Sequence, residues 1–185
     1  MGEQLLSLEG ALERMLAGVV PLPVEQVGVD DAVGRVLAEP LAARLTLPPW
    51  DNTAMDGFAV RSADVATASA GHPVTLRVVG EVAAGYAPSA RVEPGTAVRI
   101  LTGAMLPEGA DTVVPVEETD SEPGIATLPA ALAIRAPAPP GQHVRRAGSD
   151  FHAGVPLLPA GTRITSAGLA LLVAGGHGAF PVHCR

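Results

Sequence analysis

Alternation between apolar and polar residues is the commonest pattern along this chain. It is clearest in residues 73–82, whose apolar members Val74, Leu76 and Val78 are separated by polar ones. A period of two is typical of a strand with one buried face. Gly80 interrupts the pattern, and a glycine inside a strand often marks a bulge. Similar short apolar runs predict further strands at 24–29, 36–39, 58–60, 96–101, 113–116, 125–127, 131–135, 144–146, 155–158 and 179–182.

Two segments show helical spacing instead. Apolar residues recur every three or four positions in 8–17, and Ser7 can cap this helix. Thr165 or Ser166 can cap a second helix at 167–174. The chain is therefore expected to be mainly β with a few short helices. Smaller expected features are a helical turn at 30–35, a turn at 62–64 and a stiff linker in the proline-rich run 136–141.

Composition narrows the possible partners. The formal charge is −7, and all twelve basic residues are arginine. An acidic chain with scattered arginines is a poor nonspecific binder of nucleic acid, so we expect no nucleic-acid partner. The absence of lysine removes Schiff-base chemistry and a P-loop lysine. Any anion site must be built locally from arginines and backbone N–H groups.

Cysteine content and hydropathy limit the kinds of covalent cross-link, metal site and cellular location that we expect. The single cysteine, Cys184, excludes an intrachain disulfide and a multi-cysteine metal site. The first residues lack a basic region followed by a long apolar stretch, so no signal peptide is expected. Apolar runs such as 169–176 are far shorter than the ~20 residues of a membrane-spanning helix. The sequence therefore predicts a soluble cytoplasmic protein without a membrane partner.

Residues 47–60 hold the densest local chemistry. Two prolines exclude a helix, and Asp51 and Asn52 favour a turn. The turn pair Asp56-Gly57 then precedes a short strand. Loops on a rigid scaffold often hold binding groups. By itself, however, such a segment is often only a turn.

Three blocks of the sequence, of which this loop is the first, resemble motifs of one known family. Residues 47–60 resemble the PPF-x-N-S-A-M-D-G-Y-A-V signature of the MoeA/gephyrin family, with Trp50, Thr53 and Phe58 in place of its Phe, Ser and Tyr. Residues 99–111 resemble its R-I-M-T-G-A-x-x-P-x-G-A-D block, and residues 144–150 its I-R-x-x-G-E-D block. The resemblance runs from about Leu8 to Val182.

The resemblance implies a domain arrangement. In the family, a β-barrel-like domain is inserted into an elongated domain made from both ends of this part of the chain. Here, 1–47 plus 143–182 would form the discontinuous, dimerising domain, and 48–142 the insert. The family's C-terminal pterin-binding domain has no counterpart in these residues, so it is expected to be supplied in cis or in trans.

Asp56 is the first candidate site residue, followed by the turn Thr102-Gly103-Ala104. A loop carboxylate beside Gly57 can be held near a ligand, and hard oxygen ligands suit Mg²⁺, so Asp56 is also the candidate metal ligand. Gly103 can adopt a positive φ, and the successive N–H groups of its turn could then form a nest for an oxyanion. The plain alternatives are an ordinary turn residue and a hairpin.

Arg145 and Asp150 complete the candidate set. Arginine suits bidentate contacts with phosphate, but adjacent Arg145 and Arg146 point to opposite faces of a strand, so at most one faces a given ligand. Arg145 is favoured because it matches the family's arginine. Asp150 is expected either to orient that arginine, to contact ligand or to form a structural salt bridge. An acidic cluster, Glu117, Glu118 and Glu122, is taken by default as a solvated face, with a role in metal binding or dimerisation as the alternative. The five histidines show no zinc-site spacing.

The resemblance also implies an activity. MoeA-like proteins hydrolyse adenylylated molybdopterin and insert molybdate into its dithiolene with Mg²⁺, and they work as homodimers. Asp56, Thr102, Arg145 and Asp150 would belong to one wall of the cleft, whose other wall is the pterin-binding domain of the second subunit. The chain alone is not expected to be catalytically complete, and the sequence leaves open whether it is part of a truncated or a split enzyme.

Two other interpretations of the sequence assign the chain to different classes of protein. A noncatalytic dimerisation or scaffold module of the same fold would not need intact Asp56, Thr102 and Arg145. An unrelated β-rich ligand-binding domain would not be expected to insert a β domain between discontinuous ends.

Overall fold

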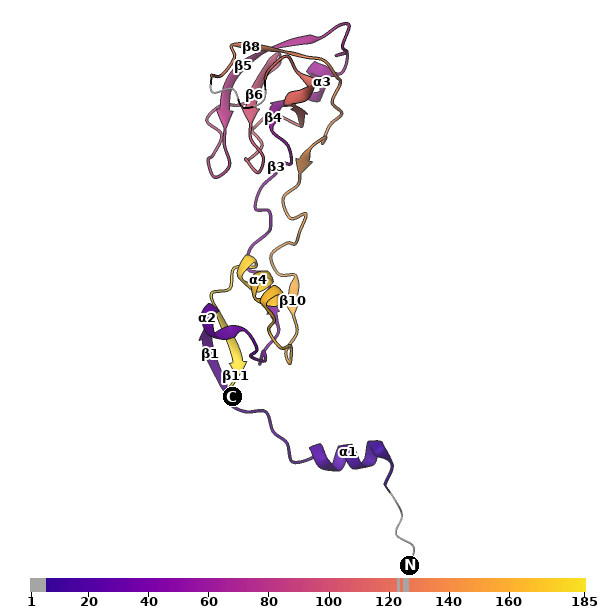
Figure 1. Cartoon of the computed structure of the whole chain (residues 1–185), viewed down its shortest axis with the longest axis vertical. Helices are drawn as coiled ribbons and strands as arrows, with labels where there is room; N and C mark the ends of the chain where they lie inside the picture. Colours follow the sequence, from indigo (N-terminus) through magenta and orange to yellow (C-terminus); the bar gives the residue numbers. More distant parts are fainter. Residues whose placement is uncertain (1–5, 123, 125–126) are drawn as a thin grey trace, which may run out of the picture. The chain divides into compact units, whose positions relative to one another are not determined.

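The chain forms two compact units. The computed structural model describes residues 6–122, 124 and 127–185. Unit 1 comprises Met1–Arg44 and Ala153–Arg185, and unit 2 comprises Leu45–His152 (Figure 1). Residues 143–152, which the resemblance places in the discontinuous domain, cluster with unit 2 because β9 (Val144–Arg145) pairs with β3 (Asn52–Thr53).

Unit 1 is built from segments of both ends of the chain. β1 (Val24–Gly28) pairs antiparallel with β11 (Ala179–His183), and β2 (Leu41–Ala42) pairs with β10 (Pro156–Leu158). The helix α4 (Ser166–Ala174) begins after Thr165, whose hydroxyl accepts the Gly168 N–H, and the one-turn helix α2 (Val29–Ala32) follows β1. Their apolar side chains form one core, whose buried members are Ala32, Leu37, Leu41, Ile164, Leu172, Phe180 and Val182.

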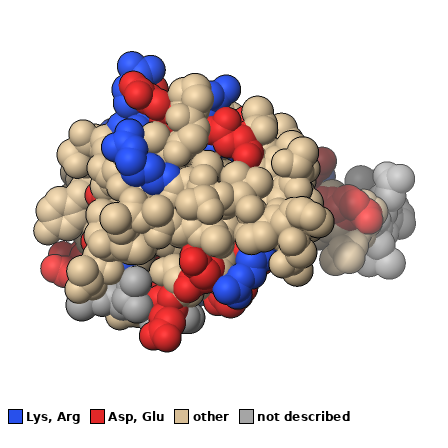
Figure 2. All heavy atoms as spheres, turned by 90° about the horizontal axis from the view of Figure 1, so that it is seen from above, with Lys and Arg blue, Asp and Glu red and all other residues tan. Residues whose placement is uncertain are grey.

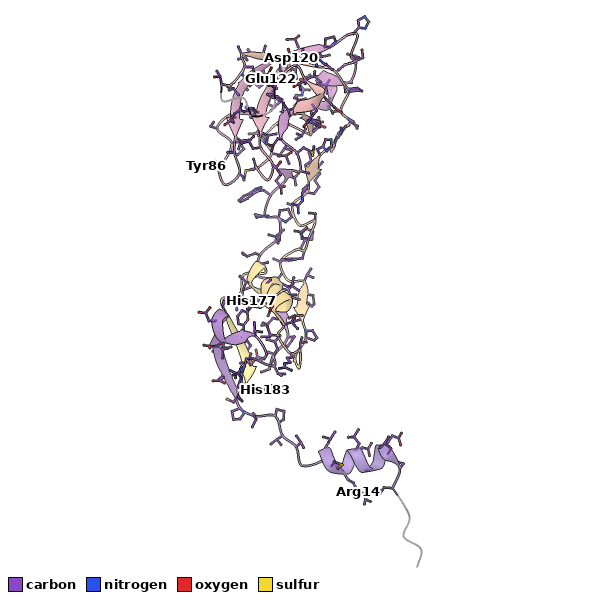
Figure 3. All side chains as sticks on the ribbon, viewed as in Figure 1. Arg14, Tyr86, Asp120, Glu122, His177 and His183 are labelled. Carbon is purple, nitrogen blue, oxygen red and sulfur yellow. The ribbon has the colours of Figure 1, made fainter. Side chains whose placement is uncertain are left out.

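The helix α1 (Leu8–Leu16) forms where the sequence predicts it, with Ser7 Oγ accepting the Gly10 N–H at 3.1 Å. None of its residues is buried. Leu8 is 82% exposed and Met15 is 76% exposed, so the apolar stripe lies on the surface of the chain. Arg14 extends from the same helix (Figure 3).

Unit 2 is built around a five-stranded sheet in the order β7-β4-β6-β5-β8. The strands are β4 (Gly57–Val60), β5 (Val74–Val82), β6 (Thr96–Ile100), β7 (Thr112–Pro115) and β8 (Ala131–Ile134). β5 and β6 run parallel, and the other pairs are antiparallel. The β5–β6 register shifts between Val78 and Gly80, which confirms the predicted bulge.

The two edges of this sheet meet. After β7, the 3-10 turn η1 (Val116–Glu118) leads to Thr119, which forms a bridge with Ile134 of β8. The Arg135 N–H donates to the Glu118 carbonyl, and the Asp120 N–H donates to that of Ala133. The sheet therefore curls toward closure, as the β-barrel-like expectation requires.

Both faces of the central strands are buried. Phe58 and Val60 of β4 lie in one core, together with Leu76 and Ile134, while Ala59 lies in a second core on the opposite face. This double burial explains why β4 reads as a continuous apolar run rather than an alternating one.

Three local expectations need correction. In place of the strand expected at 36–39, Val36 and Leu37 form isolated bridges with Arg163 and Val182. Residues 62–64 form the one-turn helix α3 (Ser62–Val65) rather than a turn, because the Asp111 carboxylate accepts both the Ser62 N–H (2.6 Å) and its hydroxyl (2.8 Å). The run 136–141 is not a free linker: Ala138 is 2% exposed, and the Pro139 carbonyl accepts the Thr112 hydroxyl. Of the strand expected at 125–127, residues 125 and 126 lie outside the described residues.

Basic and acidic side chains are interspersed around an uncharged area on the face drawn in Figure 2. Among the helices of the described residues, none is both long and apolar enough to cross a membrane.

Candidate functional site

The two-residue strand β3 joins the three sequence blocks. On one side it pairs with β9 of the third block, and the Ala54 N–H donates to the His143 carbonyl at 2.9 Å. On the other side, Thr53 exchanges backbone hydrogen bonds with Gly103 and Ala104 of the second block. Segments about 50 and 90 residues away in sequence therefore flank the loop that leads to Asp56.

Asp56 is held by Thr102. Both the Thr102 N–H and its hydroxyl donate to Asp56 Oδ1, each at 2.7 Å. The hydroxyl bond, followed by the backbone bond, lowers the pKa of Asp56 below its ordinary value. Oδ2 has no partner among the described residues, so an ionised carboxylate keeps one oxygen available at an exposed position.

The expected oxyanion nest at Thr102-Gly103-Ala104 does not form. Gly103 does adopt a positive φ of 81°. However, the Thr102 N–H is bound to Asp56, that of Gly103 to the Thr53 carbonyl and that of Ala104 to the Leu101 carbonyl. All three donors are used within the chain, so this turn positions Asp56 and β3 and offers no N–H to an anion.

Gly57 lies where β4 and β7 approach closely. A Cβ built there would lie 2.1 Å from the Val114 carbonyl oxygen, which no real side chain can do. Gly57 therefore fixes the backbone next to Asp56, and it also lines the cavity beside that carboxylate, so its role in binding ligand stays a prediction.

The two arginines of the third block form ion pairs with different aspartates. Arg146 Nη1 lies 2.6 Å from Asp51 Oδ2, while Arg145 Nη2 lies 3.4 Å from Asp150 Oδ1. The Ala147 N–H also donates to Asp51 Oδ1 at 2.8 Å, and this bond, ahead of the one from Arg146, lowers the pKa of Asp51. Asp150 therefore pairs with Arg145, which fits two of the three roles left open by the sequence: orienting that arginine and forming a structural salt bridge.

A cavity of about 390 Å³ lies beside Asp56. Its apolar lining comes from Phe58, Leu101 and Val116, and its charged lining includes Arg99, Glu117 and Glu122. Glu117 and Glu122 are exposed, which agrees with the solvated face expected from the sequence. Glu117 follows β7, which pairs with β4, so strand pairing brings it to the same cavity as Asp56.

Metal ligands are few in this region. Within 6–122, 124 and 127–185, no group of three or more histidine, cysteine, aspartate or glutamate side chains is arranged to hold a metal ion. Two histidines have structural bonds: the ring of His177 donates to the Ala42 carbonyl and that of His183 to the Leu22 carbonyl, each at 2.8 Å (Figure 3). A cation at Asp56 would therefore take most of its ligands from water or from a bound molecule.

Known proteins match both the sequence and the fold. The family profile "MoeA N-terminal region (domain I and II)" matches residues 6–176. A molybdopterin molybdenumtransferase of Synechococcus elongatus is 45% identical over 181 residues, which cover 96% of this chain and 43% of the relative. That of Bacillus subtilis is 38% identical over 160 residues, covering 85% of this chain and 36% of the relative.

Crystal structures of the molybdopterin biosynthesis MoeA protein from Pyrococcus horikoshii have the same fold. One aligns with a TM-score of 0.85 at 33% identity and covers 97% of this chain and 46% of that one. Another aligns with a TM-score of 0.82 at 35% identity. The chain thus spans less than half the length of these relatives. The chain belongs to the MoeA family and corresponds to its N-terminal region.

Proposed function

We propose that this chain supplies the N-terminal part of a molybdopterin molybdenumtransferase, which inserts molybdate into adenylylated molybdopterin. The observation that carries the proposal is Asp56, a carboxylate fixed by Thr102 at the edge of a cavity, in a chain of this family. The chain would form one wall of the active cleft, and a pterin-binding domain in cis or in trans would form the other.

Asp56 suits the role of a ligand better than that of a general base. Its lowered pKa keeps it ionised at neutral pH, where it is a weak base, while its free oxygen can bind a hard cation. Mg²⁺ is commonly held by one or two carboxylates together with water and substrate phosphates. Asp56 therefore fits as one ligand of a Mg²⁺ ion, which when bound would offset the charge of the substrate's phosphate groups.

Arg145 is the proposed contact for an anionic group of the substrate. Its side chain is half-exposed, and its bond to Asp150 is long enough to exchange for a phosphate or molybdate oxygen. Asp150 would then orient the Arg145 guanidinium both before and after the anionic group binds.

A chimera tests the proposal. We would replace the matched N-terminal region of the Synechococcus elongatus enzyme with this chain and express the chimera in cells that lack their own molybdenumtransferase. Restored activity of a molybdenum-dependent reporter enzyme is expected. Circular dichroism and gel filtration show whether the chimera is folded, and a folded chimera without activity would contradict the proposed function.

We also propose that the chain forms a homodimer through α1. Its exposed apolar stripe needs a cover, and a second copy offers an identical one. Light scattering at high micromolar concentration should give twice the monomer mass for the wild type and the monomer mass for a Leu12→Gln, Met15→Gln variant. The control is Tyr86→Gln, which alters a residue 73% exposed in unit 2 (Figure 3) and should leave the mass unchanged. A monomeric wild type would count against the dimer.

A further inference from the structure

Two adjacent arginines in the third block differ in their partners and hardly in their exposure. The side chain of Arg145 is 51% exposed and that of Arg146 is 60% exposed. Solvent access alone would make them equivalent as anion contacts. Their ion pairs distinguish them, because the closest approach is 2.6 Å for Arg146 with Asp51 and 3.4 Å for Arg145 with Asp150.

Asp51 uses both carboxylate oxygens on this segment. Oδ2 accepts from Arg146, and Oδ1 accepts the Ala147 N–H at 2.8 Å. Short hydrogen bonds to a charged acceptor are among the strong ones. One carboxylate therefore fixes both a side chain and the backbone that follows it.

Backbone hydrogen bonds hold the residues that follow this contact in the same segment. The Gly148 N–H donates to the Pro48 carbonyl at 2.9 Å, and the Asp150 N–H donates to that of Leu47 at 3.0 Å. The carbonyl of Asp51 itself accepts the Leu106 N–H at 2.9 Å from the second block. Asp51 thus lies where all three blocks meet.

We propose that Asp51 is a positioning residue that keeps Arg146 in a structural ion pair and so presents Arg145 alone to the anionic group of the substrate. The proposal rests on the proposed function for the identity of that substrate. Adjacent residues of an extended segment point to opposite faces, so holding Arg146 toward Asp51 directs Arg145 the other way. Removal of the Asp51 charge frees a second guanidinium and loosens the backbone on which Arg145 is carried.

Chemical modification tests the arginine assignment without any activity. Phenylglyoxal reacts with accessible guanidinium groups, and mass spectrometry with fragmentation separates the two positions. In this chain, Arg145 should react faster than Arg146. In Asp51→Asn, the rate at Arg146 should rise about two- to fivefold, the change that loss of an exposed ion pair supports.

The matched control is Asp64→Asn. Asp64 also accepts a backbone N–H, that of Gly95, and lies 3.9 Å from an arginine, Arg61, but it contacts none of the three blocks' site residues. This variant should leave both modification rates unchanged. Equal rates at Arg145 and Arg146 in the wild type, or an unchanged Arg146 rate in Asp51→Asn, would overturn the proposal.

Kinetics of the chimera test the consequence for substrate. Asp51→Ala and Arg145→Gln should each raise KM for adenylylated molybdopterin about tenfold with a smaller change in kcat, because both weaken binding of the anionic group. Arg146→Lys keeps the ion pair and should retain the wild-type KM. If Arg146→Lys raises KM as much as Arg145→Gln does, Asp51 does not select between them. An inactive wild-type chimera would refute the function, while the modification rates still decide the role of Asp51.

Discussion

Replacing Gly57 by alanine is expected to destabilise unit 2 strongly. The new Cβ would lie 2.1 Å from the Val114 carbonyl oxygen, 2.9 Å from the Val114 carbonyl carbon and 3.0 Å from Pro115 Cα. These are backbone atoms of β7, so relief requires β4 and β7 to separate. β4 lies between β7 and β6 and contributes Phe58 to the core, so the damage would spread through the sheet.

The size of the effect follows from the packing. Overpacking a core costs about 1–3 kcal/mol and occasionally more, and a clash with main chain belongs at the upper end. Against a total stability of about 5–15 kcal/mol, a loss of about 3 kcal/mol lowers the Tm of a domain this size by roughly 10 °C or more. Thermal and urea denaturation followed by circular dichroism would measure it.

Gly71→Ala is the control for this substitution. A Cβ at Gly71 would meet nothing within 4 Å, and Gly71 is not among the residues with positive φ. Its Tm should stay close to that of the wild type. If Gly57→Ala were equally harmless, β4 and β7 would not approach as closely as the structure has them.

Features decided by neighbours in sequence were predictable. The bulge at Gly80 follows from a glycine that interrupts an alternating strand, and the caps at Ser7 and Thr165 follow from a hydroxyl placed before a helical stripe. Each depends on contacts within a few residues. The resemblance supplied the family and the curled sheet, which local patterns alone could not.

Contacts between distant segments were not predictable. β3 has only two residues, too few for any period, yet it joins the three blocks. The same holds for Asp111, which accepts hydrogen bonds from Ser62 across 49 positions, in a segment that forms α3 where a turn is expected.

In the candidate site, too, local features were predictable and contacts between distant segments were not. The first block alone identifies Asp56 as a candidate. Its partner Thr102 lies 46 residues away, and the hydrogen bond to Asp56 occupies the Thr102 N–H, which was expected to bind an oxyanion. Glu117 is exposed, as the solvated-face interpretation expects, but only the β4–β7 pairing shows that it also lies at the cavity of Asp56. The sequence identifies the candidate side chains, whereas the strand pairing decides which of their hydrogen-bond donors remain available to a ligand.

The largest effect on activity is expected at Asp56, measured in the active chimera. Asp56→Asn keeps an oxygen that can accept both Thr102 hydrogen bonds but removes the charge, so it tests the charge separately from the turn. Loss of one preorganised electrostatic contact costs about 10²–10³-fold in kcat, and we expect a fall in this range. Asp64→Asn, which removes a carboxylate elsewhere in unit 2, should retain wild-type activity.

The pH dependence provides a second test of the same carboxylate. Thr102 lowers the pKa of Asp56 in the folded chain, so its charge is present above the ordinary pKa of an aspartate and is lost only as the pH falls through the lower, folded value. Activity should therefore not decline through protonation of Asp56 between about pH 8 and pH 5. Thr102→Val removes the hydroxyl donor that dominates this shift and should move any acid loss of activity to higher pH. Wild-type activity in Asp56→Asn would remove Asp56 from the site.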